Sequence, residues 1–311
     1  MVRRGQSMSS LVAMAVAAGS LAIHAQRPPA GTLDGIWNYA TMTPLERPRD
    51  LAAKPVLTPG EAADYERQTI ERQRATNNTA GPDWWDPGTR FLTNGRTSLI
   101  VDPAGGRVPA QTAEAQQRAA ARAQARRARG SADGPEDRAL NERCLNWTVA
   151  GPPMLPGVYN NNVQIIETRD YVALVSEMIH DARIIPLNAK HKPAELAPWM
   201  GDSIGWYDRD TLVVETVNMT RGGGGVPISP TGKITERFTR YNDKQVFYEF
   251  EVDDPTLYTQ VWKGQMSLNA SPGLYEYACH EGNYALHGIL AAGRQNDRKG
   301  ISNDSSKDGT E

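Results

Sequence analysis

Long apolar runs are nearly absent from this chain. The exception is the 13-residue stretch LVAMAVAAGSLAI, which follows the basic segment MVRRGQSMSS and ends shortly before Ala25. A basic start, an apolar run too short to span a bilayer and a small residue at the cleavage position are typical of a signal peptide. We predict a signal peptide over residues 1–25 and a periplasmic or secreted mature protein without a transmembrane segment. The alternative is a buried N-terminal helix.

An excess of charge of one sign is also lacking. The net charge is −2 and the sequence pI is about 6.3, which gives no reason to expect nucleic acid as a partner. Residues 111–143 are the local exception, because Ala, Gln and Arg dominate there. This segment is either a basic arm for an anionic partner or a solvated helix. The acidic DGPED, which follows the alanine- and arginine-rich part of this segment, favours the second interpretation, a helical insert at about 111–140.

Cysteine is scarce, since Cys144 and Cys279 are the only two in 311 residues. Neither lies in a CxxC motif or in the sequence context of a nucleophile. In an exported protein the simplest interpretation is one disulfide, which would close a loop of more than 130 residues. Two free thiols or a catalytic cysteine are the alternatives.

From Cys144 onward, short strand-like runs alternate with turn residues, and few helical patterns intervene. The runs are NVQIIET, YVALVSEMI, GWYDRDTLVVETVNM, ITERFTRYNDKQVFYEFEVDD, LYTQVWKGQMSL and LYEYACHE. This pattern predicts a mainly β fold with an antiparallel, barrel-like (lipocalin- or calycin-like) sheet, and a sandwich as the alternative. We expect one β-rich domain over residues 26–292 and a disordered tail over 293–311, because the tail is too polar to pack.

Three features are expected before Cys144. A helix begins at Thr58 or Pro59, and SLIVDPAGGRVP is typical of a hairpin. Gly35-Ile36-Trp37, at the start of the first strand, resembles the G-x-W of lipocalin-type barrels, where the tryptophan closes one end of the barrel.

The segment SEMIHDARIIP, residues 176–186, places ionisable residues in what is otherwise a buried strand. In a continuous strand Glu177, Asp181 and Arg183 share one face and His180 points to the other. His180 is the candidate general acid or base, because histidine titrates near neutrality. Glu177 or Asp181 would orient it. Arg183 would pair with Asp181 or bind an anionic group, and replacing Asp181 would then leave a buried arginine unpaired.

A second pair of candidate catalytic residues lies in YEYACHEG. If this run is the last strand, Glu276 and His280 lie on one face about 13 Å apart and could flank a ligand that crosses the sheet. A zinc site made of His180, His280 and a carboxylate is conceivable. The sequence has no short metal-ligand spacing, however, so we assign no metal and no cofactor.

Substrate-binding candidates come from two further segments. Tyr159 and Asn161 belong to YNNNVQ, and asparagine amides suit hydroxyl-rich ligands, although Asn is also a common turn residue. Trp206 and Glu215 belong to GDSIGWYDRDTLVVET. Its Gly-Asp-Ser resembles the start of a class of lipolytic serine hydrolases, but here it precedes a hairpin and not a strand-to-helix turn.

Several of these segments together resemble a family of exported bacterial proteins of unsettled function. The resemblance is carried by EMIHDARIIP, GDSIGWYDRDTLVVET and YEYACHEGNY, with further support from ERCLNW, GPPMLPGVYNNNVQIIE and ITERFTRYN. It extends over most of residues 31–292. It implies an exported, β-rich domain whose polar motifs gather around the histidine-containing strand, and it assigns no catalytic roles.

Two classes of function remain open from the sequence. The first is an exported enzyme that uses acid–base chemistry, a hydrolase or lyase acting on a carbohydrate or glycoside-like substrate. The second is a non-catalytic barrel that binds a small apolar or sugar-like ligand. The density of ionisable residues in strands that should be apolar favours the enzyme, because proton transfer needs such groups and a binding barrel needs few of them.

Overall fold

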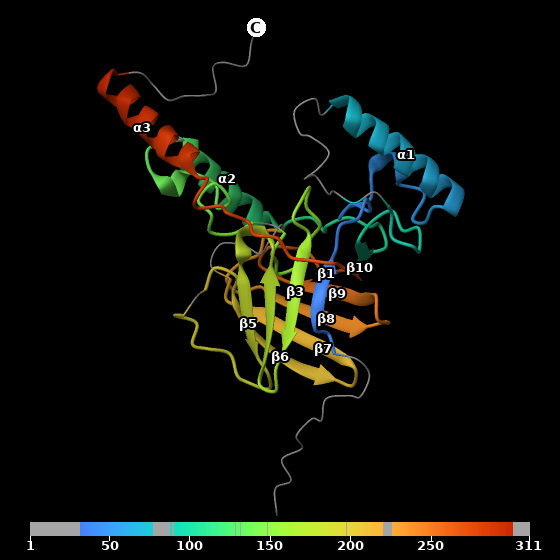
Figure 1. Ribbon diagram of the computed structural model, residues 1–311. Coiled ribbons are helices and arrows are strands. Elements are labelled where there is room, and N and C mark those ends of the chain that lie inside the picture. The colour runs from blue at the N-terminus through green and yellow to red at the C-terminus, as the bar shows by residue number, and fades with distance from the viewer. Residues whose placement is uncertain are drawn as a thin grey trace, which may run out of the picture.

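The computed structural model describes residues 32–76, 88, 90–127, 129, 130, 132–147, 149–196, 198–219 and 226–300. Nine strands form one antiparallel sheet in the order β5-β4-β3-β1-β10-β9-β8-β7-β6, which curls into a nearly closed barrel (Figure 1). A short tenth strand, β2, pairs with β10 beside this path. The strands are β1 (Gly35–Asn38), β2 (Ile100–Asp102), β3 (Asn162–Glu167), β4 (Tyr171–Ser176), β5 (Ala182–Pro186), β6 (Asp202–Asp208), β7 (Thr211–Val217), β8 (Lys233–Arg240), β9 (Gln245–Asp253) and β10 (Trp262–Ala270). The mainly β, barrel-like prediction is confirmed.

The barrel closes between its two edge strands, β5 and β6. The contact is a single parallel bridge between Leu187 and Gly205, and the Asn188 N–H donates to the Gly205 carbonyl at 2.7 Å. A Cβ atom at Gly205 would lie 3.0 Å from Ile185 Cγ2 and 3.3 Å from Leu187 Cδ2. Glycine at this position therefore lets the two edges approach closely.

Alternating side chains fill the inside of the barrel. On β9, Val246, Tyr248, Phe250 and Val252 are buried while the residues between them are half-buried. The Phe250 ring lies over Gly264 of β10, where a Cβ atom would clash with it at 2.2 Å. The largest buried side chains of the protein are Trp37, Trp262, Tyr39, Tyr248, Phe238 and Phe250. The period-2 pattern that predicted the strands thus also predicts much of the core.

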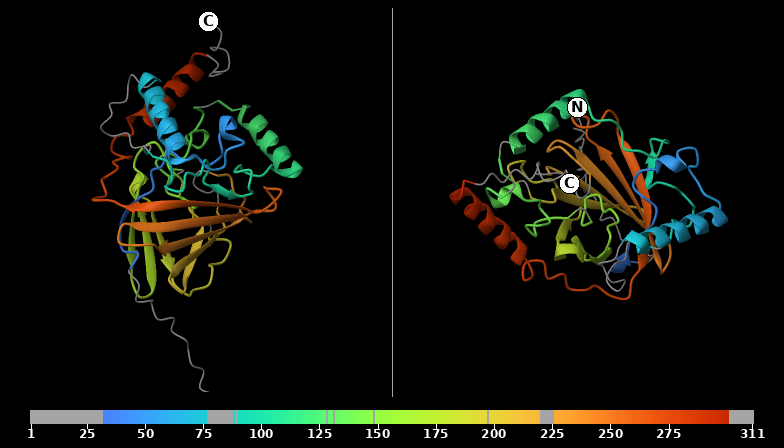
Figure 2. Two further views of the ribbon diagram at one scale, coloured as in Figure 1. Left: turned by 90° about the vertical axis from the view of Figure 1, so that its right-hand side faces the viewer. Right: turned by 90° about the horizontal axis from the view of Figure 1, so that it is seen from above.

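Three helices lie over one end of the barrel (Figures 1 and 2). They are α1 (Pro59–Thr76), α2 (Ala113–Arg127) and α3 (Tyr284–Arg298). α1 begins at the predicted position because Thr58 and Glu61 form a capping box: the Glu61 N–H donates to Thr58 Oγ1 and the Thr58 N–H donates to the Glu61 carboxylate. α2 lies within the predicted insert. Among the described residues, no helix is long and apolar enough to cross a membrane.

Two predictions about chain segments differ from the structure. α3 continues to Arg298, so residues 293–298 are helical and not part of the disordered tail expected there; Gly293 is buried close to Ala132, which anchors this part of the helix. The hairpin expected in SLIVDPAGGRVP is wrong, because β2 pairs with β10 and the Val108 N–H bonds to the Glu46 carboxylate. Residues 1–25 and 301–311 lie outside the described part of the chain.

The tryptophan of the G-x-W is buried at the entry to the barrel. Trp37 Nε1 donates to the Leu33 carbonyl at 2.9 Å, and the Arg240 guanidinium lies 4.9 Å from the centre of its ring. Arg240 also donates to the Thr32 carbonyl at 2.6 Å. An arginine from β8 therefore covers the tryptophan and holds the segment that leads into β1.

Candidate active site

The segment that carries His180 is a hairpin loop and not a continuous strand. β4 ends at Ser176 and β5 begins at Ala182, and the two strands pair antiparallel with Val175 opposite Ala182. Between them Ile179 and His180 have φ values of 57° and 46°. Non-glycine residues rarely adopt this left-handed conformation, least of all β-branched ones, and such strain is often found at functional sites. The expected sharing of faces by Glu177, Asp181 and Arg183 is therefore wrong.

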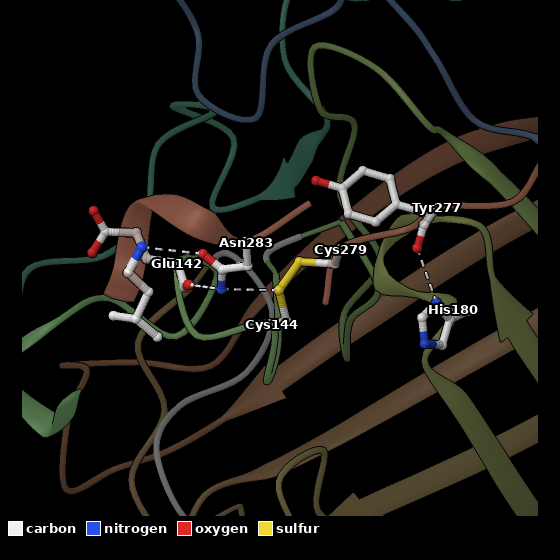
Figure 3. Close-up of a disulfide and its surroundings, with 7 residues drawn as sticks. Glu142, Cys144, His180, Tyr277, Cys279 and Asn283 are labelled. Carbon is white, nitrogen blue, oxygen red and sulfur yellow. Dashed lines mark hydrogen bonds between the residues drawn. A yellow bond between two sulfur atoms is a disulfide. The ribbon is translucent and has the colours of Figure 1, made fainter. Parts of the chain in front are cut away.

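The loop presents His180 at the end of the barrel that carries the helices. Its side chain is exposed, and its Nδ1 lies 3.1 Å from the Tyr277 carbonyl (Figure 3). A carbonyl oxygen can only accept a hydrogen bond, so Nδ1 carries the proton and Nε2 of the neutral ring is left as the acceptor. The ring of His280 lies 6.4 Å from that of His180, centre to centre. Two motifs that are distant in the sequence thus meet here.

Glu177 does not orient His180, contrary to the sequence-based expectation. Its carboxylate is buried and accepts hydrogen bonds from Asn160 Nδ2 at 2.5 Å, Asn162 Nδ2 at 2.7 Å and the Tyr275 N–H at 3.2 Å. Asn160 and Asn162 lie just before β3 and at its first position, and Tyr275 lies in the segment that carries Tyr277. Glu177 therefore ties both segments to the hairpin loop and has a positioning role.

Arg183 does not pair with Asp181 either. Its guanidinium makes a two-pronged ion pair with Glu236 of β8, at 2.6 and 2.9 Å, inside the barrel. Tyr248 donates to the same carboxylate at 2.8 Å and accepts from the Met154 N–H at 3.0 Å. Burial and the neighbouring Glu236 raise the pKa of Tyr248 well above its usual value. Arg183 is thus committed to a structural ion pair across the barrel.

Asp181 is the ionisable residue of the loop whose environment is most unusual. Its Oδ2 atom is buried and has no hydrogen-bond partner among the described residues. Burial raises the pKa of Asp181 to about 6, although the adjacent His180 lowers it. A carboxyl group that titrates close to neutrality can give or take a proton under working conditions.

A disulfide holds the segment that faces His180. Cys144 and Cys279 are bonded, with their Cα atoms 5.9 Å apart, as predicted (Figure 3). Next to it, Asn283 Nδ2 donates to the Glu142 carbonyl at 2.7 Å, and Asn283 Oδ1 accepts from the Leu286 N–H at the start of α3. The last strand expected in this segment is wrong: residues 271–283 are extended or turns and join no sheet. The disulfide and the hydrogen bond from the Tyr275 N–H to Glu177 hold this segment, which has no hydrogen-bonded neighbour strand.

Aromatic residues and a cavity border this segment. Tyr159 stacks on Tyr277 with ring centres 6.5 Å apart, and Trp147 meets Tyr159 edge to face at 5.9 Å. A cavity of about 450 Å³ lies between this segment and α3. Its lining includes Tyr277 and Glu276, so Glu276 faces the cavity. Tyr159 thus lies beside the candidate site.

The other predicted substrate-binding residues do not join the site. Asn161 is buried and closes the turn at Gly157, accepting from its N–H at 2.7 Å and donating to its carbonyl at 3.1 Å. Glu215 bonds to His191 and Lys233 at 3.2 and 3.4 Å. Trp206, on β6, is not among the side chains that pack on the core. We find no contact that connects these three residues with His180 among the described parts of the chain.

Sequence reasoning missed three residues that matter. Glu236 occupies an inward position between Ile234 and Phe238, so the alternation within ITERFTR could have identified it as buried. Tyr277 acts through its backbone carbonyl, which leaves no signal in the sequence. His191 bridges the carboxylates of Asp202 and Glu215, at 2.8 and 3.2 Å, from an irregular connection between β5 and β6.

No protein-family model, curated protein or solved structure matches this chain. A functional assignment therefore depends on the geometry of the site. Within the described residues, no group of three or more His, Cys, Asp or Glu side chains is arranged to hold a metal ion. The candidate site consists of His180, His280 and Asp181; Tyr277 and Glu177 join the loop that carries His180 to the segment that carries His280, which the disulfide also holds.

Proposed function

We propose that this protein is an exported hydrolase that cleaves a glycosidic bond by acid–base catalysis at the helix-covered end of the barrel. The observation that carries the proposal is the facing pair of His180 and His280, 6.4 Å apart, beside a carboxyl group with a raised pKa. Groups that exchange protons near neutral pH are what such a reaction requires.

The roles follow from the hydrogen bonds of each group. His180 Nε2 accepts a proton from a water molecule, and the oxygen of that water attacks the anomeric carbon. The Tyr277 carbonyl, which accepts a hydrogen bond from Nδ1–H, stabilises the positive charge of the resulting imidazolium. Asp181, when protonated, supplies a proton to the oxygen that leaves as the glycosidic C–O bond breaks. His280, on the other side, hydrogen-bonds the substrate. The proton count balances, since water provides one proton and the leaving group takes one.

A lyase is less well supported. β-Elimination from an acidic sugar needs a cation that neutralises the substrate carboxylate. Arg183, the cation that the sequence offered for this purpose, is buried and bound to Glu236. The non-catalytic binding barrel also loses support, because aromatic side chains and this ion pair occupy the inside of the barrel.

Export is supported by two observations. The N-terminal sequence has the pattern of a signal peptide. The disulfide is compatible with an oxidising, extracytoplasmic location, where such bonds persist.

The test is an activity screen of the purified, non-reduced protein against neutral glycosides and polysaccharides, with release of reducing ends as the readout. We expect turnover of at least one neutral substrate. His287→Asn serves as a matched control, because His287 is exposed on α3 and does not line the cavity. Turnover of acidic polysaccharides alone, with unsaturated products, would indicate a lyase and contradict the proposal.

A further inference from the structure

The cavity beside the disulfide is large enough for a ligand of its own. Its volume of about 450 Å³ lies in the range of small-molecule sites. It adjoins the histidine pair through Tyr277, whose carbonyl bonds to His180 and which also lines the cavity. A ligand in the cavity would therefore lie next to the proposed reaction centre.

The two walls of the cavity differ in polarity. α3 contributes Ala285, Leu286 and Ile289, which form an apolar wall. The opposite side is polar, with amide and carboxylate groups from Asn141, Glu142, Asn160 and Glu276. A sugar ring has the same division, since its C–H face is apolar and its rim carries hydroxyl groups. The Glu142 carboxylate and the Asn160 Nδ2 group already have partners in Arg138 and Glu177, so Asn141 and Glu276 are the groups that can accept hydrogen bonds from those hydroxyls.

The charge of the lining selects against anions. Glu142 and Glu276 are the only ionisable carboxylates that line the cavity within the described residues, and no lysine or arginine lines it there. Glu142 pairs with Arg138 at 2.6 Å, which together with the Ala139 N–H holds the pKa of Glu142 below its usual value. Its charge is therefore largely balanced, and Glu276 is the carboxylate of the lining that disfavours an anion. A carboxylate ligand would meet the like charge of Glu276 and no lysine or arginine of the lining.

The cavity is also held in shape without a ligand. The Cys144–Cys279 bond joins two of the segments that line the cavity, and Asn283 connects the start of α3 to the Glu142 carbonyl. Preformed sites lose less entropy on binding than flexible ones.

We propose that this cavity is a second sugar subsite, which binds an uncharged sugar unit next to the unit that is cleaved. The inference rests on the proposed function and extends it. The substrate is then a neutral oligosaccharide, and a single glycoside with a small leaving group uses only part of the site.

The binding test uses the full-length mature His180→Asn protein, which should not turn over its ligand. The probes are cellobiose, maltose and N,N′-diacetylchitobiose, with cellobiouronic and digalacturonic acid as acidic counterparts, and calorimetry is the readout. We expect at least one neutral disaccharide to bind about tenfold more tightly than either acid. Equal or tighter binding of the acids, or no binding of any probe, would overturn the proposal.

A cavity-filling variant locates the binding. Ile289→Trp should block the cavity and weaken the neutral disaccharide about tenfold or more, whereas Ala291→Trp, which lies on the opposite side of α3, should not. In the active protein, Ile289→Trp should raise KM for oligosaccharides and leave an aryl monoglycoside unaffected. If disaccharides bind but nothing is hydrolysed, the proposed function fails and the subsite stands. If oligosaccharides are hydrolysed equally well by Ile289→Trp, the subsite fails and the function stands.

Discussion

The imidazole rings of His180 and His280 lie 6.4 Å apart, although one comes from the β4–β5 loop and the other from the disulfide-held segment before α3. Their closeness comes from the segments that carry them. His180 bonds to the Tyr277 carbonyl, and Glu177 holds the Tyr275 N–H of the same segment. A strained loop on one side and a covalent brace on the other thus keep the two imidazoles close together at one end of the barrel.

Replacing His180 by asparagine should not destabilise the fold. His180 is exposed and has a φ of 46°, and asparagine tolerates this left-handed conformation better than most residues. Its amide can also donate to the Tyr277 carbonyl in place of Nδ1. We expect a melting temperature equal to or slightly above that of the unmodified protein in differential scanning calorimetry. A clear decrease would mean that the histidine has a structural role.

Asp181→Asn should change stability in a pH-dependent manner. The carboxyl has a pKa of about 6 in the folded protein, against about 3.9 in unfolded chains. Between these values the folded state binds more protons, so the unmodified protein loses stability as pH rises from about 4 to about 6. Asparagine does not ionise, so the variant does not lose stability in this way. Melting temperatures of the two proteins should diverge in favour of the variant from pH 4 to pH 7; a constant difference would show that Asp181 is not perturbed.

The same variant should alter the pH profile of activity. If Asp181 is the proton donor, kcat/KM of the unmodified protein falls as pH rises above about 6, because the carboxyl is then ionised. Asp181→Asn should lower kcat/KM by about 10²-fold and remove this limb of the profile. If kcat/KM of the variant still falls above pH 6, a group other than Asp181 causes the decrease.

The Arg183–Glu236 pair should behave as a buried ion pair. Arg183→Met or Glu236→Leu alone leaves one charge buried and unpaired, which costs about 3–5 kcal/mol. The double variant removes both charges and should recover most of that loss. Urea denaturation of the four proteins measures the coupling. Additive losses in the double variant would contradict the pairing.

The disulfide should matter more to the site than to the barrel. Cys144→Ser/Cys279→Ser removes a long-loop cross-link worth about 4–5 kcal/mol in the unfolded-chain entropy model, yet the nine-stranded sheet retains its own core. We expect β-type circular dichroism to persist at low temperature while glycoside turnover is lost. Non-reducing peptide mapping of the unmodified protein should recover Cys144 linked to Cys279, and alkylation of both thiols without reduction would contradict the bond.

The strands could be predicted because alternation is a local signal. ITERFTR and QVFYEFEVD show it clearly, and both are strands. The reversal at Glu177–Asp181 could not be predicted, because its central residues Met178 and Ile179 are apolar and lack the usual turn chemistry. Their burial in the core, together with the bonds of Glu177, stabilises a conformation that local propensity disfavours.

The sequence indicated where candidate residues lie better than which groups they contact. His180, His280 and Asp181 could be recognised because ionisable residues interrupt apolar runs. Their partners depend on which strands meet across the barrel, as Arg183 and Glu236 do. Likewise, YEYACHE has the composition of a strand, but a strand also needs a neighbour for its ladder, and this segment has a disulfide and a carboxylate instead.

The most direct measurement is the rate of glycoside cleavage by His180→Asn and His280→Asn, compared with the unmodified protein and the His287→Asn control. The facing pair predicts that His180→Asn loses about 10²-fold or more in kcat/KM, that His280→Asn loses activity as well, and that His287→Asn retains it. If both site variants remain fully folded and cleave the substrate as fast as the control, the histidine pair is not the reaction centre.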